Sequence, residues 1–474
     1  FHPVDLKDKD GLLALARSIP ELVGVFTAGT DFSASVAYVA NALGLPGIPY
    51  ETALDASDKA RMRAKLAQAA VPVPAWVAGS KHDDPLALSA SLGLRDGPWV
   101  VKPVDNMGAR GCSLTRNKDE LVLAWRTAVE SSRSGRAIIE DYLDGPEFSI
   151  DALVCGDSIA IRGVADRQVT FEPYFVELGH TMPSAYDQDV IDEVLSVFKR
   201  GVKALGISLG AAKGDIKFTK NGAFVGEIAA RLSGGFMSGW TYPYASGQDP
   251  AREAIALACG DKPMLYDGSC SLVSAERAWI SIPGTVKRVV GLGTAMNIQY
   301  VKNVFPRAKA GDRVVFPVNN VQKCGNVISQ AADRNAAEEA ALRAARSVLV
   351  ELQSGDRETE AFLAQPYGQW PPLAFADVSA MMLAQVESIP DIMRDKRLVR
   401  SLGWAPLLGI RAEHSKDWLG RSISESLEAV TALTGATESM EADLVLGRLF
   451  WKALFRGGYQ AAAWVLSTAL SERQ

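Results

Sequence analysis

The sequence has few cysteines, few histidines and no excess of basic residues. Its five cysteines are scattered and no two form a CxxC pair, so neither a disulfide framework nor a zinc site is indicated. The formal net charge is -5, whereas a nucleic-acid-binding domain usually carries a basic excess. No apolar run reaches the length needed to cross a bilayer, and no signal peptide opens the sequence. We therefore expect a cytoplasmic protein.

What the sequence does contain is the composition of a large globular protein. Its 474 residues, 48% of them hydrophobic, are too many for one core, so two to four domains are expected. Residues 1–56 are typical of the later part of a doubly wound α/β domain. Because the sequence opens on Phe1 rather than Met, we expect the first strand and helix of that domain to precede it. Within it, residues 22–29 predict a buried strand, and Asp31 and Ser57 each predict a helix cap.

The stretch 215–235, DIKFTKNGAFVGEIAARLSGG, carries the strongest chemical signal. Apolar and polar residues alternate on both sides of an Asn-Gly pair, which predicts a β-hairpin. A two-residue loop at the Asn-Gly pair puts Asp215 and Glu227 on opposite faces of the sheet. A three-residue loop, residues 220–222, with Gly222 in the left-handed conformation, places the two acids directly across from each other. We predict the three-residue loop.

In that register one face of the hairpin meets a core and the other carries charge. The core face is predicted to hold Ile216, Phe218 and Phe224, and the charged face Asp215, Lys217, Glu227 and Arg231. Two carboxylates and a guanidinium on one patch suit Mg²⁺, which takes one or two carboxylates and completes its shell with phosphate and water. A hairpin with an exposed ion pair explains the same residues, so at this point both interpretations stay open.

Two segments before the hairpin carry further candidates. The helix after Ser57 has a basic face that includes Lys59, Arg61, Arg63 and Lys65, which a solvated surface also explains. Residues 98–114 predict a strand ending near Lys102, a glycine loop over residues 105–111 and a second strand. Such a loop lets backbone N–H groups approach an anion, although glycine turns between strands are also common.

Residues 137–154 predict a strand, a turn and another strand, with Glu140 and Glu147 beside an apolar element that could meet a flat base edge. Residues 164–185 are polar, aromatic and broken by prolines, so we predict an irregular segment. It contains Glu177 and His180, for which we set a substrate-site hypothesis against the commoner structural role of a histidine.

The remainder of the chain predicts an α+β region to about residue 351, a linker over residues 365–373 and then mostly helices. The helices contain Trp404, Trp418, Trp451 and Trp464 and the apolar series Leu446, Leu449, Phe450, Ala453 and Leu454. Core or subunit packing is the expected use of these residues, and a membrane-surface role is the alternative.

Taken together, the order and spacing of these segments resemble the ATP-grasp superfamily, specifically its carboxylate-amine ligases, over about residues 20–350. EDYLDGPE is similar to the adenine hinge of D-alanyl-D-alanine ligases, and FVELGHTMPSA resembles L-amino-acid ligases of the bacilysin-forming type. The resemblance implies an α/β (α+β) ATP-grasp fold between a partial α/β domain and a helical C-terminal region. The implied parts are residues 1–56, 57–145, 146–355 and 366–474.

The resemblance also implies a role for each candidate residue. Lys59 and Lys102 would reach the α- and β-phosphates, under a lid formed by residues 105–111. Asp215 and Glu227 would bind the metal, and Arg231 would hold an acyl phosphate. Glu177 and His180 would line the amino-acid pocket. The nucleotide set comprises Lys59, Lys102, Asn106, Gly108, Gly111, Glu140, Tyr142, Leu143, Glu147 and Arg167, with Glu140 and the backbone of residues 141–143 at the adenine and Glu147 at the ribose.

The implied activity is ATP-dependent formation of an acyl phosphate from a carboxylate, followed by its capture by an amine. The resemblance also implies the cofactors ATP and two Mg²⁺ ions, with Mn²⁺ as an alternative to Mg²⁺. The expected partners are small-molecule substrates and a second copy of the chain in a homodimer. One departure matters: many members carry Asn where this sequence has Ala229, and Ala cannot coordinate a metal. Two rivals therefore remain, an ATP-binding regulatory protein that has lost the reaction and a carboxylase-type enzyme. The sequence lacks the glycine-dense lid and the QVEHPVTE motif of biotin carboxylases.

Overall fold

The computed structural model describes residues 2–91, 93, 97–261, 265–388, 415–434 and 447–471. The chain splits into two compact units. The first comprises Phe1–Arg277, Val318–Val321 and Ile328–Glu339, and the second comprises Ala278–Pro317, Gln322–Val327 and Ala340–Gln474. The four-part division predicted from the sequence is finer than this and stays a prediction.

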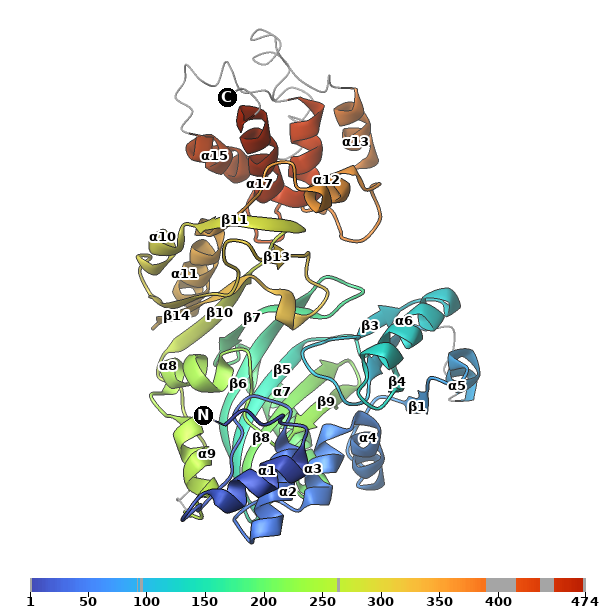
Figure 1. The fold of residues 1–474 in the computed structure, drawn as a ribbon, viewed down its shortest axis with the longest axis vertical. Helices are drawn as coiled ribbons and strands as arrows, with labels where there is room; N and C mark the ends of the chain where they lie inside the picture. Colours follow the sequence, from blue (N-terminus) through green and yellow to red (C-terminus); the bar gives the residue numbers. More distant parts are fainter. Residues whose placement is uncertain are drawn as a thin grey trace. The chain divides into compact units, whose positions relative to one another are not determined.

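The first unit begins with four helices, which Figure 1 shows in blue: α1 (Lys9–Ser18), α2 (Ser33–Leu43), α3 (Tyr50–Ser57) and α4 (Lys59–Gln68). Three local predictions are corrected here. Phe32 rather than Asp31 precedes α2, and Asp58 rather than Ser57 caps α4 by accepting from two backbone N–H groups. Residues 22–27 form no strand, because none of the sheets in the described residues offers this segment a partner.

A small antiparallel sheet follows, with strand order β1-β4-β2-β3. Its elements are β1 (Trp76–Ser80), α5 (Pro85–Ser91), β2 (Trp99–Pro103), β3 (Ser113–Thr115), α6 (Lys118–Ser131) and β4 (Arg136–Asp141). The predicted strand, glycine loop and strand over residues 98–114 are confirmed as β2, its loop and β3. Trp99 and Val101 of β2 pack with Leu121 and Trp125 of α6 in one core. The glycine loop therefore follows a strand that is fixed against a helix.

Most of a larger sheet, of order β12-β14-β10-β7-β6-β5-β8-β9, lies in the first unit, and its edge strand β12 (Val301–Pro306) belongs to the second. The other strands of this sheet are β5 (Glu147–Cys155), β6 (Ser158–Thr170), β7 (Val176–Met182), β8 (Leu209–Thr219), β9 (Gly222–Ala229), β10 (Val273–Trp279) and β14 (Gly325–Ala331). The helices beside it are α7 (Gln188–Leu205), a π-helical turn (Met237–Thr241), α8 (Tyr242–Ser246) and α9 (Pro250–Ala258). The irregular segment predicted over residues 164–185 is wrong, because most of it forms β6 and β7.

Both faces of this sheet are covered. Phe198 and Val202 of α7 share a core with Ile150 of β5 and Ile216 of β8. On the opposite face, α9 packs on Leu153 of β5 and on β8. Since successive strand residues point to opposite faces, odd-numbered residues of β5 and β8 share the α9 face. The candidate acids lie on that second face, toward the C-terminal end of β8.

The second unit holds a three-stranded sheet of order β13-β11-β15 and most of the C-terminal helices. Its elements are β11 (Gly284–Val290), α10 (Leu292–Met296), β12 (Val301–Pro306), β13 (Arg313–Val314), a 3-10 turn (Asn320–Gln322), α11 (Arg334–Ser347), β15 (Leu349–Leu352), α12 (Arg357–Ala364), α13 (Ala380–Glu387), α15 (Ile423–Thr434) and α17 (Arg448–Ser471), the turn and α11 lying partly in the first unit.

The predicted helical C-terminal region is confirmed over its described part. Trp451, Phe450 and Leu454 are buried in a helix core, and Trp464 is buried in a second core with Trp279, so these side chains pack inside the unit as expected. Leu449 is exposed, and Trp404 and Leu446 lie outside the described residues. No helix in the described ranges is long and apolar enough to cross a membrane.

Candidate active site

The two predicted metal ligands face each other on neighbouring strands. In the β8–β9 hairpin Asp215 pairs with Glu227, as predicted. The loop prediction was wrong, however, because Thr219 pairs with Gly222 and leaves only two loop residues. The pairing shifts by one residue between Ile216 and Asp215, where Gly226 is the extra residue of a β-bulge. The bulge, and not the loop, brings the two carboxylates opposite each other.

The bulge also changes which residues share the core face. Ile216 pairs with Val225, and both side chains are fully buried in the core under α7. Phe224, which we expected on that face, pairs with Lys217 instead and lies on the other face. Between the turn and the bulge the observed register differs by one residue from the predicted register. In that part of β9 the face that we predicted to carry charge therefore lies toward the core.

Asp215 is bound by three groups of the protein. Its Oδ1 accepts a hydrogen bond from Ser149 Oγ at 3.1 Å. Its Oδ2 forms ion pairs with Lys213 Nζ and with Arg167 Nη1, the second at 3.2 Å. Lys213 was not among the residues predicted from the sequence, although its position two residues before Asp215 places it on the same strand face.

Glu227 is paired with the first of the predicted nucleotide lysines. Lys59 Nζ lies 3.2 Å from Glu227 Oε1 and donates to the carbonyl oxygen of Asn106 at 2.9 Å. Burial acts to raise the pKa of Glu227, but Lys59, Lys213 and Arg231 lower it well below the usual range. Burial acts against the charge of Lys59, yet Glu227 raises its pKa above the ordinary value. Both groups are therefore charged at neutral pH.

The second predicted lysine belongs to a buried ion-pair group. Lys102 Nζ lies 2.7 Å from Glu140 Oε2, and Arg63 Nε lies 2.8 Å from Glu140 Oε1. Arg63 also donates to the carbonyl oxygen of Gly226 at 2.7 Å, so it ties this group to the bulge. Both carboxylate oxygens of Glu140 are therefore occupied by cations, which is hard to combine with a side-chain contact to adenine. Sequence analysis placed Arg63 only on a solvated helix face, whereas it is fully buried.

The glycine loop after β2 has the backbone conformation that its composition predicted. Gly108 and Gly111 have φ angles of 66° and 71°, in the region that favours glycine. A Cβ on Gly111 would lie 2.6 Å from Ser131 Cβ, so the position is sterically closed as well. Asn106 Nδ2 donates to the Ser131 carbonyl oxygen at 2.8 Å. The loop is thus anchored to the end of α6 and lies beside Lys59.

The predicted adenine hinge follows β4. The backbone N–H groups of Asp141 and Tyr142 donate to the carbonyl oxygens of Ala75 at 3.0 Å and Pro98 at 3.2 Å. Leu143 is the next residue of the hinge. Glu147, the predicted ribose ligand, begins β5 and forms an ion pair with Arg167.

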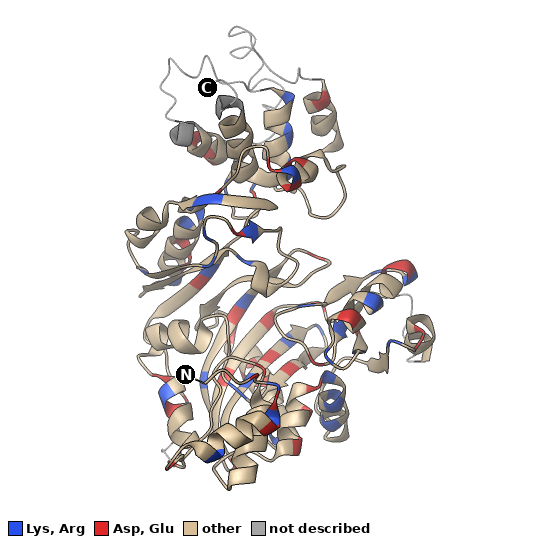
Figure 2. Ribbon diagram, viewed as in Figure 1, with Lys and Arg blue, Asp and Glu red and all other residues tan. Residues whose placement is uncertain are grey.

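Arg167 connects three of the predicted sites. Besides Glu147 and Asp215, it pairs with Glu177 at 2.8 Å. His180 lies near Glu177, with Nδ1 3.8 Å from its Oε1. Nδ1 also lies 3.6 Å from Glu276 Oε2, a buried β10 carboxylate that sequence analysis missed. Figure 2 shows acidic and basic segments close together on the strands of this sheet. The structure thus brings the predicted substrate pair next to the predicted nucleotide and metal residues.

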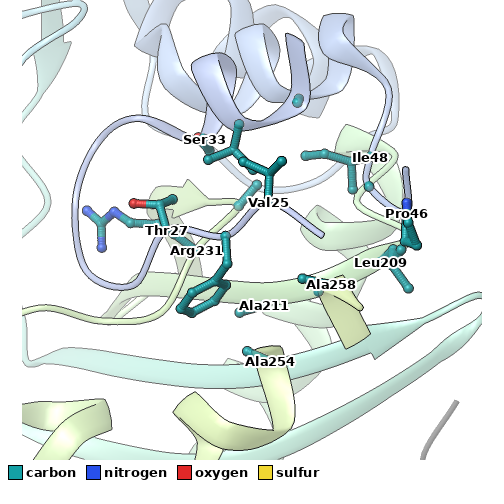
Figure 3. Close-up of a pocket in the computed structure, with 16 residues that line it drawn as sticks. Val25, Thr27, Ser33, Pro46, Ile48, Leu209, Ala211, Arg231, Ala254 and Ala258 are labelled. Carbon is teal, nitrogen blue, oxygen red and sulfur yellow. The ribbon is translucent and has the colours of Figure 1, made fainter. Parts of the chain in front are cut away.

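Arg231 follows β9 and borders a cavity of about 60 Å³ lined mostly by apolar residues. Its Nη1 donates to the Leu232 carbonyl oxygen at 2.9 Å, but its buried Nε has no partner among the described residues. Figure 3 shows the Arg231 guanidinium beside Thr27, inside the bend of the loop that carries Thr27. A buried guanidinium with a free N–H suits an anionic ligand. The cavity lining is Val25, Phe26, Thr27, Ser33, Val36, Ala37, Pro46, Gly47, Ile48, Leu209, Gly210, Ala211, Ala230, Arg231, Ala254 and Ala258.

The two acids Asp215 and Glu227, together with the two lysines, fit a metal-bound nucleotide better than a metal ion alone. In the part of the chain that the structure describes, no group of three or more His, Cys, Asp or Glu side chains is arranged to hold a metal ion. Asp215 and Glu227 supply two hard oxygen ligands, so a divalent cation there needs phosphate oxygens to complete its shell. Lys59 and Lys102 stand on the small-sheet side of the same site, where they can meet those phosphates.

The comparisons with known proteins agree with this fold. Residues 96–239 match the family model of the ATP-grasp domain, and residues 278–353 match the L-amino acid ligase C-terminal domain 2. An uncharacterized protein, y4rH, of Sinorhizobium fredii (strain NBRC 101917 / NGR234) is 26% identical over 359 residues, which is 73% of this chain and 72% of that protein.

Two solved structures have the same fold. The L-amino acid ligase from Bacillus licheniformis superposes with a TM-score of 0.64 at 20% identity, covering 74% of this chain and 87% of that one. The biotin carboxylase domain dimer of the Hydrogenobacter thermophilus 2-oxoglutarate carboxylase, in complex with MgADP, ADP and bicarbonate, gives 0.56 at 18% identity, covering 72% and 79%.

Proposed function

We propose that this chain is an ATP-dependent carboxylate-amine ligase of the ATP-grasp superfamily, because it matches both the ATP-grasp domain and the L-amino acid ligase C-terminal domain 2. In this proposal a carboxylate, preferentially that of an amino acid, is activated as an acyl phosphate and joined to an amine. The products are an amide or dipeptide, ADP and phosphate. The observation that carries the proposal is the cross-strand pair Asp215–Glu227 beside Lys59.

The nucleotide lies, in this proposal, between the two sheets of the first unit. Lys59 and Lys102 neutralise its phosphates, and the loop over residues 105–111 covers them with its backbone N–H groups. The N–H groups of Asp141 and Tyr142 already have partners, so we place the backbone contact to adenine at Leu143. Glu140 then holds Lys102 in position instead of contacting adenine with its carboxylate.

The metal site is formed by Asp215 and Glu227. A Mg²⁺ bound there supplies charge neutralisation at the transferring phosphoryl group. Glu147 accepts from the ribose hydroxyls. Its ion pair with Arg167 fixes the direction of the carboxylate, and Arg167 in turn holds Asp215. Nucleotide position and metal-ligand position are therefore linked through one guanidinium.

Acyl transfer then follows in two steps. A carboxylate oxygen of the substrate attacks the γ-phosphorus, the bond to ADP breaks, and an acyl phosphate forms. The amine nitrogen attacks the acyl carbon, the C–O bond to phosphate breaks, and the amine proton leaves to a base. The candidates for that base are Glu177, His180 and the departing phosphate. Arg231, with its free Nε, stabilises the oxyanion of the tetrahedral intermediate.

The substrate amino acid lies near Glu177 and His180 in this proposal. Glu177 accepts from its ammonium group, and His180 is held in one orientation by Thr241 Oγ1, 2.7 Å from Nε2. The apolar cavity beside Arg231 accepts a small apolar group of either substrate.

A second candidate function rests on Ala229. Its methyl group lies on β9 two residues after Glu227, buried and without a ligand atom, which also suits an ATP-binding regulatory protein of this fold without ligase activity. A carboxylase-type reaction is the other alternative within the same chemistry.

One experiment separates these candidates. The protein is incubated with Mg-ATP, a matrix of amino acids and hydroxylamine, and ADP, phosphate and hydroxamate are measured. Hydroxamate that depends on a particular amino acid supports acyl phosphate formation, and a second matrix of amines then identifies the acceptor by product mass. ATP binding without any carboxylate-dependent ADP release supports the regulator. ADP release that depends on bicarbonate alone supports a carboxylase.

A further inference from the structure

Lys213 occupies an unusual place at the metal site. It lies on β8 two residues before Asp215, so both side chains project from the same face. Its partner across the hairpin is Ala229, just as Glu227 is the partner of Asp215. The four positions form a rectangle with two acids at one end and an ammonium opposite a methyl group at the other. Lys213 Nζ bends toward the acids and pairs with Asp215 Oδ2.

The two acids differ in how much of each is left for a metal. Asp215 already receives Ser149 on Oδ1 and both Lys213 and Arg167 on Oδ2, and its side chain is 12% exposed. Glu227 pairs with Lys59 through Oε1 and is 26% exposed. Glu227 is therefore the more open ligand, while Asp215 is largely neutralised by protein cations.

We propose that Lys213 takes the place of a second divalent cation, so that this site works with one divalent ion, held chiefly through Glu227 and the nucleotide phosphates. The inference rests on the proposed function and deepens its metal site. A second Mg²⁺ would need one or two protein oxygen ligands in addition to phosphates and waters, and the methyl group of Ala229 offers none. It would also lie beside an ammonium and a guanidinium, and like charges at such separations repel strongly in a partly buried site.

The arrangement has a chemical consequence for phosphoryl transfer. The Lys213 ammonium contributes one positive charge and three N–H donors. When the nucleotide binds, this ammonium can change its partner from Asp215 to a phosphate oxygen. Lys213 thus supplies charge neutralisation from the protein that does not depend on the free metal concentration.

The test counts bound metal directly. The wild-type chain is titrated with Mn²⁺ in the presence of a non-hydrolysable ATP analogue, free Mn²⁺ is followed by electron paramagnetic resonance, and bound analogue by equilibrium dialysis. The same titration is made on Lys213→Met, on the double variant Lys213→Met/Ala229→Asn, and on Lys220→Met as a control in the exposed hairpin turn. Circular dichroism confirms that each variant is folded before it is titrated.

We expect one Mn²⁺ per bound analogue in the wild type and in Lys220→Met, and a twofold rise, to two, in the double variant. If the double variant does not fold, Lys213→Met alone still tests the proposal. Removing the ammonium takes one cation away from Asp215, so this variant is expected to bind more than one Mn²⁺ per analogue. Two Mn²⁺ per analogue in the wild type overturns the inference. So does a value of one in every folded variant, since Lys213 is then not what limits the number of ions. A wild-type chain that binds no analogue removes the proposed function itself, a result distinct from either.

Discussion

Asp215 and Glu227 face each other across β8 and β9 because one extra residue, Gly226, is inserted in β9 between Val225 and Glu227. On the turn side of the bulge the hairpin directs Ile216 and Val225 to the core. On the other side it presents two acids at the same level on the opposite face. A bulge that aims a side chain in this way is a recurrent feature next to active sites. The site therefore depends on a backbone irregularity as much as on the acids.

Gly226→Ala is predicted to damage the site through the backbone. A Cβ at this position would lie 2.9 Å from the Asp215 carbonyl oxygen, and a backbone atom cannot move away cheaply. We expect a loss of stability of about 1–3 kcal/mol and, because Glu227 is displaced, a fall in kcat of about 100-fold. Urea unfolding and ADP release measure the two effects. The control is Gly293→Ala, where an added Cβ meets nothing within 4 Å. Wild-type turnover in Gly226→Ala would show that the bulge has no role in the chemistry.

Glu227→Gln tests the metal assignment with the least change of shape. The amide keeps the volume but removes the charge that pairs with Lys59 and that binds a hard cation. We expect carboxylate-dependent ADP formation to disappear, while the far-ultraviolet circular dichroism spectrum stays that of the wild type. Glu130→Gln, at an exposed position of α6, is the matched control. Unchanged turnover in Glu227→Gln, measured at saturating Mg²⁺, would exclude Glu227 as a metal ligand.

Local pattern predicted the hairpin, the glycine loop and the helical C-terminal region, but not the contacts that complete the site. Arg63 contacts Glu140 and Gly226, which are 77 and 163 residues away in sequence. On its own helix it is one of several basic residues and carries no distinguishing signal. Glu276 is likewise a single acid until β10 pairs with β7 beside His180. Long-range pairing, which no window of sequence contains, creates both contacts.

The strands β6 and β7 show a second reason for failure. His180 is buried there, and Arg167 and Glu177 are half-buried, because polar groups in these strands satisfy one another through ion pairs and hydrogen bonds. From the sequence alone they are typical of a solvated loop. The missing strand over residues 22–27 is the opposite case, since an apolar pattern without a neighbouring strand forms no ladder. In both segments the presence of a neighbouring strand and of partners for the polar side chains, not the composition, determined whether a strand formed.

Glu140→Gln is predicted to be the most destabilising of the conservative changes at the site. It leaves Arg63, whose side chain has no exposed surface, without its carboxylate partner, and breaking one half of a buried ion pair typically costs about 3–5 kcal/mol. Urea unfolding at pH 7 measures the loss. Glu130→Gln, at an exposed position on α6, is expected to change stability by only about 0.5 kcal/mol. A comparable loss in both variants would mean that the buried position is not special.

The same residue gives a prediction for pH. Burial acts to raise the pKa of Glu140, but Arg63 and Lys102 lower it below its usual value. A carboxylate whose pKa is lowered in the folded state stabilises the fold above its unfolded pKa of about 4.3 and loses that contribution as the pH falls through the folded value. The difference in stability between wild type and Glu140→Gln is therefore expected to be constant from pH 8 to about 5 and to shrink in more acid solution. A difference that grows on acidification would contradict the ion-pair account.

Cys112, next to the glycine loop, is predicted to react slowly with alkylating reagents despite lying among cations. Burial raises the pKa of its thiol to about 12, although Lys102 and Lys59 act in the opposite direction. Since only the thiolate is nucleophilic, a raised pKa means that the reactive form is scarce at neutral pH and increases about tenfold per unit of pH. Iodoacetamide labelling followed by peptide mass spectrometry between pH 7 and 10 should show that increase with no plateau. The exposed Cys259 reports reagent activity in the same sample, and circular dichroism confirms that the fold persists. A plateau below pH 10 would place the thiol in a more polar environment than the structure gives it, one in which water reaches the glycine loop.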